Sequence, residues 1–467
     1  MDDPLLFAGV GAERAVNQTP VADEPPRLRR PDRRQVLLQP CCLEDLLPPE
    51  HEFRTLWAVV AKLDLSAFYA PLRCRGSSPG RGATDPQLLV GLWLAGATCG
   101  VGQARALARL CEHDERFKWM CGGVSVNHHT LGDFRVGHAG ALDALFTSVL
   151  ALLMAEGLVH VDRITQDGLR VRAAAGHGSF KRAGKLEAAL DEAKAQVAAL
   201  AEQGRREQEQ ARGQDPADEN SERSRLRSDR QRAAQERAAR ERQERIERAM
   251  AQMPELEKIK QNRRNKEPRS AARASTTDGD ARVMKMPDGG FRPACNVQIA
   301  ADTASRAILA VSVSNKGTDQ PHSQPLRKQV QARTGRSARE HLMDGGFVKL
   351  EAITESEAAG AAVYAPPKET KFRKKRSDTR ADPYTPVAGD TPEVIAWRTR
   401  MAGPEAQAIY RQRAATSETI NADLRCFRGL VQLTVRGLDK ALSVVLWSAL
   451  AYNLMHFGAS LLRRMTT

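Results

Sequence analysis

Two aspartates share the same local setting, and their carboxylates could do chemistry together. Asp167 follows the alternating run "LVHVDRI" and precedes Gly168, while Asp344 follows "REHLM" and precedes two glycines. Alternation of apolar and polar residues predicts a strand, so each aspartate is predicted to end one. An Asp–Gly pair is common in turns, which would explain a single such position. Two of them at the ends of predicted central strands favour a shared site.

Carboxylates that converge from neighbouring strand ends could bind Mg²⁺, which prefers oxygen ligands. Two such ions can activate an attacking oxygen and stabilise a leaving oxygen on one phosphate, so phosphoryl transfer is the chemistry expected. A third acid usually comes from a helix beside the sheet, and Glu418 in "YRQRAATSETINADLR" is the candidate. The competing interpretation gives each acid an arginine as an ion-pair partner: Arg170 or Arg172 for Asp167, and Arg413 or Arg425 for Glu418.

The overall charge indicates a nucleic acid partner. The 467 residues include 71 Lys and Arg against 57 Asp and Glu, a formal net charge of +14. The low aromatic content of 5% favours duplex DNA held through its phosphates over stacked single strands. We predict no membrane segment and no secretory signal. The eight scattered cysteines are typical of a reducing compartment, so we expect a cytoplasmic, nucleoid-associated protein.

The N-terminal third of the chain is predicted to lack strands. Residues 1–50 are rich in Pro and Arg without sustained periodicity, and we predict a disordered leader. Residues 51–156 show helical spacing interrupted by glycines, and we predict a helical DNA-binding domain. The pattern is compatible with a helix-turn-helix DNA binder and equally with a plain helical bundle.

Residues 181–265 form a charged segment between the first predicted strand and the others. Apolar residues repeat at four–three spacing from Leu186 to Leu200, which is typical of a short coiled coil, and they return from Ile246 to Leu256. We predict a helical hairpin that is apolar at its base and heavily charged toward its tip. The alternative is a solvated or disordered insertion without a role.

The remaining residues, 157–180 and 266–467, predict a catalytic domain of the α/β class. Strand patterns occur at 158–172, 291–302 and 306–316, and the second and third are predicted to form a hairpin. Helices and further strands then alternate. Three successive strands followed by alternation predict a mixed sheet flanked by helices.

Three motifs occur in order along this domain: "TQDGLRVRA", "LMDGGF" and "YRQRAATSETINADLR". Together with the helical stretch at 84–137, they resemble bacterial insertion-sequence transposases of the DDE class. The first two look like that family's first-acid and second-acid strands, and the third looks like its tyrosine–arginine–glutamate–lysine helix. The resemblance runs from about residue 54 to the end of the chain, and because the catalytic domain of that class is ribonuclease H-like, it implies that fold for residues 157–180 and 266–467.

The resemblance implies that Asp167, Asp344 and Glu418 are the catalytic triad and bind two Mg²⁺ ions, with Mn²⁺ as an alternative metal. It also implies a DNA transposase that cleaves strands at the element ends and joins them to target DNA. A homodimer would act on the terminal inverted repeats. The rival readings are a ribonuclease H-like nuclease without strand transfer and an inactive, DNA-binding transposase relic.

Basic residues near these motifs are the candidate DNA contacts. Tyr410 and Arg413 fall at the family's tyrosine and arginine, which implies contact with phosphates of the element ends, and Arg411 is an alternative contact. Arg425 stands where the family usually has lysine, which keeps the charge but changes its geometry. The remaining predicted DNA contacts follow the first acid or form the "KFRKKR" cluster: Arg170, Arg172, Lys371, Arg373, Lys374, Lys375 and Arg376.

Overall fold

The computed structural model describes residues 42–73, 82–211, 219–262, 268, 271–367 and 382–466. Residues from Leu43 onward form one compact unit. The predicted leader, 1–50, is too long, because Leu47 is only 5% exposed and Glu44 forms a salt bridge with Arg54. Residues 1–41 of that prediction lie outside the described residues.

Short helices precede the sheet, and side-chain caps begin four of them, among them those of Asp85 and Asn127. Asp85 accepts a hydrogen bond from the Gln87 N–H, and Asn127 accepts hydrogen bonds from the His129 and Thr130 N–H groups, each at 2.9 Å. The elements are η1 (Leu43–Leu46), α1 (Glu52–Val60), α2 (Ser66–Tyr69), α3 (Pro86–Thr98), α4 (Ala104–His113), α5 (Glu115–Cys121), α6 (His128–Gly137) and α7 (Ala139–Ala155).

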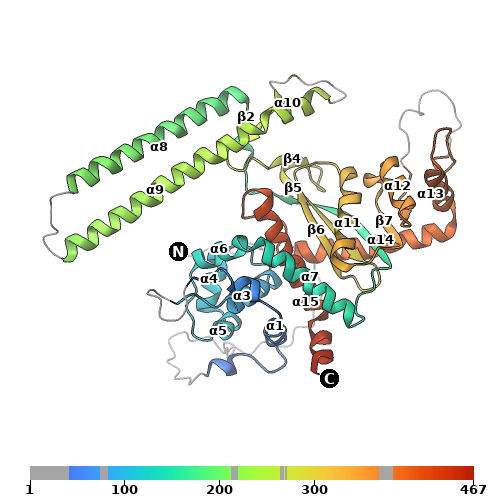
Figure 1. The fold of residues 1–467 in the computed structure, drawn as a ribbon, viewed down its shortest axis with the longest axis horizontal. Coiled ribbons are helices and arrows are strands. Elements are labelled where there is room, and N and C mark those ends of the chain that lie inside the picture. Colours follow the sequence, from blue (N-terminus) through green and yellow to red (C-terminus); the bar gives the residue numbers. More distant parts are fainter. Residues whose placement is uncertain are drawn as a thin grey trace, which may run out of the picture. The chain divides into compact units, whose positions relative to one another are not determined.

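A mixed sheet follows, as the strand pattern predicts (Figure 1). Its central strand β1 is antiparallel to β5 on one side and parallel to β7 on the other, and β8 is parallel to β7. The far edge of the long strand β5 pairs with both β4 and β6. The strands are β1 (Arg163–Arg172), β4 (Arg282–Lys285), β5 (Phe291–Asp302), β6 (Ile308–Ser314), β7 (Glu340–Met343) and β8 (Ala362–Tyr364).

The first predicted strand differs from β1 in where it starts and in where Asp167 lies along it. The pattern predicts a strand from residue 158 that ends at Asp167, whereas β1 begins at Arg163 and Asp167 lies in its middle. The reason is tertiary: β5 is long enough to pair with β1 as far as Arg172. Asp344 does follow the end of β7, as predicted.

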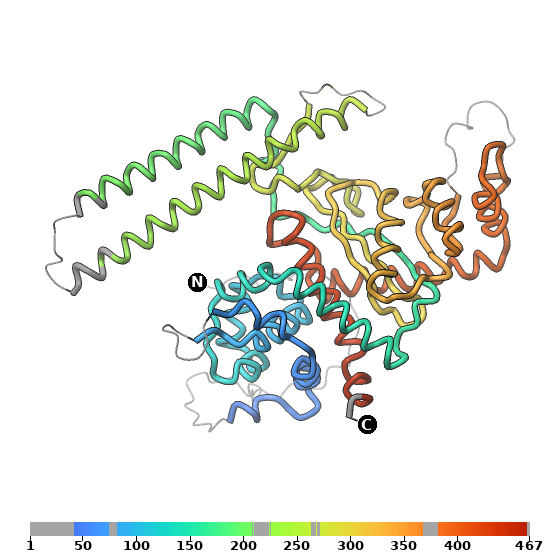
Figure 2. The backbone as a smooth tube through the Cα atoms, in the orientation of Figure 1, coloured from blue at the N-terminus to red at the C-terminus, as the bar shows by residue number. Residues whose placement is uncertain are grey.

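A helical hairpin is inserted in the chain after β1 and before the next strands of the main sheet, and its two arms run side by side (Figure 2). They are α8 (Ala183–Ala211) and α9 (Glu219–Ala251), followed by α10 (Met253–Asn262). A small sheet of β2 (Phe180–Lys181) and β3 (Ala274–Ser275) joins the two ends of the hairpin. Leu186, Ile246 and Met253 are buried at its base, as predicted from their spacing.

Helices cover both faces of the sheet. Thr165 and Ser417 bring α14 against one face of β1, and Gln166 contacts the backbone of His322, just before α11, on the other. The predicted helix over 392–427 is broken at Gly403, because Pro404 cannot continue the hydrogen-bond ladder. The elements are η2 (His177–Ser179), η4 (Gln320–His322), α11 (Ser323–Thr334), η5 (Gly345–Phe347), α12 (Leu350–Ala358), α13 (Pro392–Ala402), α14 (Pro404–Cys426) and α15 (Leu438–Thr466).

The helical segment and the sheet share one hydrophobic core. Helix α15 packs against α1, α3 and α7 as well as against β6. It is long and apolar enough to cross a membrane, but 72% of its apolar window is buried inside the protein, as in a core helix. The core therefore continues across residue 156, where we predict a domain boundary.

Candidate active site

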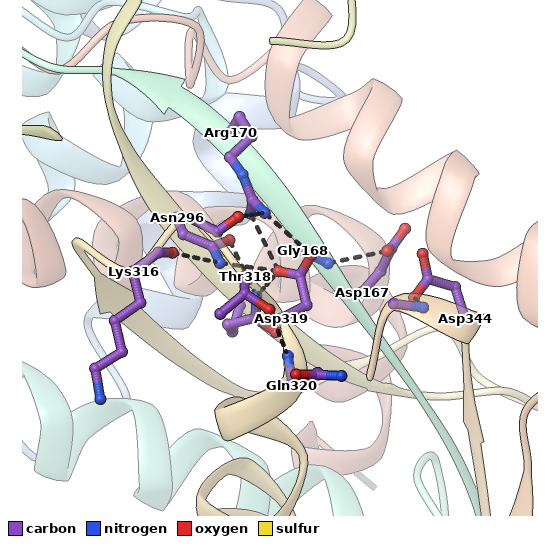
Figure 3. Close-up of polar contacts among 12 residues, drawn as sticks. Asp167, Gly168, Arg170, Asn296, Lys316, Thr318, Asp319, Gln320 and Asp344 are labelled. Carbon is purple, nitrogen blue, oxygen red and sulfur yellow. Dashed lines mark hydrogen bonds and ion pairs between the residues drawn. The ribbon is translucent and has the colours of Figure 1, made fainter. Parts of the chain in front are cut away.

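The pairing of β1 with β7 brings the two aspartates together. The last paired residues of these parallel strands are Gln166 and Met343. The next residue after each of them is an aspartate, Asp167 or Asp344. Figure 3 shows the carboxylates of Asp167 and Asp344 side by side. Asp344 also caps η5, where its Oδ1 accepts a hydrogen bond from the Gly346 N–H at 2.7 Å. Two acids 177 positions apart in sequence thus share one site.

Helix α14 provides the partners of Asp167. The Arg413 guanidinium lies 3.5 Å from Asp167 Oδ2, and the Asn421 amide donates a hydrogen bond to the same oxygen at 3.0 Å. The Arg413 guanidinium also lies 5.9 Å from the ring centroid of Tyr410. Positions 410, 413, 417 and 421 recur at helical spacing, so one face of α14 is directed at β1. Neither Arg170 nor Arg172 neutralises Asp167.

The Asp167 carboxyl is electrostatically unusual. Burial raises its pKa to about 6, and the neighbouring Asp344 and Asp319 carboxylates add to the increase. The Arg413 guanidinium and the hydrogen bond from the Gly168 N–H oppose it. A single guanidinium therefore faces a pair of carboxylates, which leaves the site short of positive charge.

Glu418 is not part of this cluster. Its side chain is exposed, one helical position away from Ser417 and so turned from the face that contacts β1. Among the described residues, no group of three His, Cys, Asp or Glu side chains could hold a metal ion. The structure brings Asp167 and Asp344 together, and the assignment of Glu418 as the third acid stays a prediction.

A second polar cluster lies on the opposite face of β1, against Gly168 (Figure 3). Arg170 donates hydrogen bonds to both carboxylate oxygens of Asp319, at 3.1 and 3.0 Å. The amides of Asn296 and Gln298 donate to the same carboxylate at 2.8 and 2.7 Å. Despite its burial, Asp319 has a lowered pKa because these donors, Arg170 foremost, favour the charged form. Arg170 is thus occupied by Asp319, which favours a structural role over the predicted DNA contact.

The other predicted DNA contacts differ in exposure. Arg172 and Arg411 are exposed, Tyr410 and Arg425 are half-buried, and the Arg413 side chain is only 15% exposed. The basic cluster at 371–376, which contains Lys371, Arg373, Lys374, Lys375 and Arg376, lies outside the described residues.

The sequence analysis did not predict two residues of these polar clusters, Asn421 and Asp319. Asn421 lies four positions after Ser417 and eight after Arg413, so projecting the helix around Arg413 would have pointed to it. Asp319 precedes a predicted helix and has the sequence features of an ordinary helix start. No local signal pairs it with Arg170, 149 positions away.

The fold and site thus define a mixed α/β protein with paired carboxylates on adjacent parallel strands. Residues 41–136 match the family model described as a transposase domain (DUF772). This match, over the helical segment, supports a transposase family for the chain. No curated protein and no solved structure matches it.

Proposed function

We propose that this protein is a DDE-type DNA transposase that cleaves DNA at the ends of an element and transfers the cut strand to target DNA. The observation that carries the proposal is the juxtaposition of Asp167 and Asp344 at the end of the β1–β7 pairing. The match to a transposase domain at residues 41–136 supports it from a different part of the chain.

The sheet supports a ribonuclease H-like catalytic domain. Its first three long strands, β1, β5 and β6, are antiparallel neighbours, and β7 and β8 extend the other side of β1 in parallel. With the charged hairpin set aside, this agrees with the predicted order of three successive strands followed by alternation. Asp167 lies in the central strand and Asp344 directly follows its parallel neighbour, so both acids lie at one position beside the sheet.

The residues present fit a divalent cation. Asp167 and Asp344 present carboxylate oxygens, the ligands that Mg²⁺ prefers, and one guanidinium does not balance both charges. These two aspartates would hold the metal, and Glu418, which is exposed on α14, would have to turn toward them to act as the third ligand. A bound metal would polarise the phosphate and favour an oxygen nucleophile at neutral pH.

The chain's own residues orient the acids and bind the substrate. The Asn421 amide fixes the orientation of the Asp167 carboxylate through its hydrogen bond. Arg413 Nη1, the atom that lies 3.5 Å from Asp167 Oδ2, is buried and forms no hydrogen bond among the described residues, so a phosphate oxygen beside Asp167 could accept one from it. The ring of Tyr410 lies against this guanidinium. Arg413 would therefore hold the scissile region of the DNA beside the two carboxylates.

The test is cleavage and joining of a duplex that carries the element's terminal repeats, in the presence of Mg²⁺. Asp167→Asn and Asp344→Asn should each lower cleavage by about 10³-fold or more, because loss of a metal ligand removes several kcal/mol of transition-state stabilisation. Asp439→Asn removes an exposed acid of α15 and is the matched control. Full activity in either site variant would refute the proposal, whereas cleavage without joined products would leave only a nuclease.

The exposed Glu418 specifically favours one rival, a DNA-binding protein without catalysis. Glu418→Gln separates the two functions. A loss of cleavage as large as that of Asp167→Asn would make Glu418 the third ligand. If wild-type protein binds DNA but shows no metal-dependent cleavage, the non-catalytic function holds.

A further inference from the structure

The base of the helical hairpin contains a basic cleft that the proposed chemistry does not use. Its volume is about 570 Å³, and it lies between α8, α9, the loop after β3 and the turn before α15. Among the described residues that line it, Glu192 is the acidic one. The basic ones come from four separate segments: Lys181, Lys185, Arg242, Arg245 and Arg436.

The positive charge of this cleft is poorly neutralised. Glu192 forms a salt bridge with Arg242 at 3.1 Å, so it does not neutralise the other basic side chains of the cleft. Within the part of the chain that the structure describes, Lys181, Lys185 and Arg436 form no salt bridge. A cluster of cations that repel one another in this way favours an anion as its ligand.

Arg245 has a guanidinium nitrogen that no described protein group satisfies. Its Nε is buried and has no hydrogen-bond partner among the described residues, and its contact with Glu241 is long, at 3.6 Å. Burial, followed by the repulsion of Arg436, lowers the pKa of Arg245. A phosphate oxygen would satisfy the guanidinium and separate the two positive charges.

The walls of the cleft are fixed to one another. Asp280 accepts hydrogen bonds from the Gln252 amide, at the end of α9, and from the Leu438 N–H, at the start of α15, at 2.7 and 3.2 Å. Asp278 accepts one from the Gly437 N–H at 3.2 Å. The loop that contributes Thr276 and Thr277 to the cleft therefore ties the hairpin to α15.

One wall of the cleft is joined to the end of β1. Arg172 is exposed and lies five residues beyond Asp167, roughly 17 Å along an extended strand, and the alternation of side chains puts it on the opposite face of the sheet from Asp167. Its backbone pairs with Gln432, four residues before Arg436. Duplex DNA carries a charge about every 1.7 Å of its axis, so a duplex that reaches the cleft can also present a phosphate to Arg172.

We propose that this cleft binds the phosphate backbone of duplex DNA, so that the hairpin insertion acts as a DNA-holding arm. The inference rests on the proposed function, because it assigns a contact surface to the same substrate. The net charge of +14 and the exposed Arg172, whose backbone pairs with Gln432 close to Arg436 of the cleft, favour DNA over an acidic protein.

The test measures the salt dependence of binding to a duplex oligonucleotide of unrelated sequence, without divalent metal. A triple variant, Lys185→Gln, Arg245→Gln and Arg436→Gln, should lower the slope of log K against log salt by between about 2 and 3, because each lost phosphate contact removes roughly 0.9. The matched control changes three exposed arginines of α9 outside the cleft, Arg230→Gln, Arg237→Gln and Arg240→Gln, and should keep most of the slope.

Charge-retaining variants exclude a folding defect. The full chain with Lys185→Arg and Arg436→Lys in place of the glutamines should keep the wild-type salt slope. Equal slopes for the triple variant and its control would overturn the inference, and binding of an acidic protein instead would do the same. Because the assay needs no cleavage, a reduced slope in a protein without nuclease activity would refute the proposed function and leave the cleft as a DNA-binding site.

Discussion

At the scale of single residues, the structure replaces the local ion pairs with distant ones. Asp167 is paired with Arg413 of α14 rather than with Arg170 or Arg172. Arg170 is held by Asp319 on the other face of the sheet. Alternation along β1 explains the separation, because side chains at 167 and 170 point to opposite faces. The arginines that are near Asp167 in sequence are thus not the ones near it in space.

Gly168 is required by the close approach of Asp319. A Cβ at this position would lie 2.6 Å from Asp319 Oδ1 and 2.8 Å from Gln298 Nε2. We expect Gly168→Ala to destabilise the protein by about 1–3 kcal/mol through overpacking. It should also lower cleavage roughly 10–100-fold, because displaced β1 moves the neighbouring Asp167.

Urea unfolding and a cleavage assay check both effects. Gly140→Ala is the control, since no atom lies within 4 Å of the Cβ it would add in α7. There the change should be neutral or stabilising by up to about 1 kcal/mol. A Gly168→Ala protein with wild-type stability and activity would show that the Asp319 cluster does not position β1.

His341 should make stability depend on pH. It is fully buried in β7, and neither ring nitrogen has a hydrogen-bond partner among the described residues. Burial, assisted by Arg327, lowers its pKa from 6.5 to about 3. Between these values only the unfolded chain binds the proton, so stability falls as pH falls below 6.5. At pH 5 the loss should be about 2 kcal/mol.

Urea unfolding at pH 7 and pH 5 measures this loss. His341→Leu fills a similar volume without titrating, so its free energy of unfolding should fall less than that of the wild type between the two pH values. An equal pH dependence in both proteins would contradict the burial of a neutral imidazole at this position.

At the scale of elements, one buried amide of α15 forms hydrogen bonds with the sheet, in addition to their apolar contacts. Asn453 is fully buried, and its side chain accepts from the Ile308 N–H and donates to the Ile308 carbonyl, both at 2.9 Å. Ile308 begins β6 opposite Ala301 of β5, beside a register shift, and among the described strands β6 pairs with β5 alone. Asn453 thus replaces the strand partner that β6 lacks there.

Asn453→Ala should therefore destabilise the protein by at least about 2 kcal/mol. The variant leaves two buried backbone groups without partners, and each such group costs about 1–3 kcal/mol. The midpoint of urea unfolding measures the loss. Lys440→Ala, at an exposed position of the same helix, should change it by less than about 0.5 kcal/mol. Similar midpoints for the two variants would show that α15 does not depend on this amide.

At the scale of the whole molecule, the helical segment and the sheet depend on each other. Both contribute to one hydrophobic core through α15. We expect the amides of α3 and α7 to exchange with the same global free energy as those of β1 and β5. Native-state hydrogen exchange measures this directly. Two groups with clearly different free energies would indicate independently stable domains.

The sequence predicts the elements better than their ends. The hairpin of β5 and β6, the apolar base of α8 and α9, and the strand before Asp344 are confirmed, because each depends on a local periodicity. The start of β1 and the position of Asp167 within it were predicted wrongly because partner strands decide them. The short strand β4 was missed, because its residues "RVMK" do not alternate between apolar and polar.

The sequence by itself determined the residue types and their order: two Asp–Gly motifs, the arginines on either side of Glu418 and an excess of positive charge. These are local properties, so they can be read without a fold. Only the tertiary structure decided which groups meet. The parallel pairing of β1 with β7 brings Asp344 to Asp167, and the packing of α14 brings Arg413 and Asn421. Arg170 lies on the other face of β1, where it binds Asp319. Contacts between residues far apart in sequence depend on register and packing, which no local pattern contains.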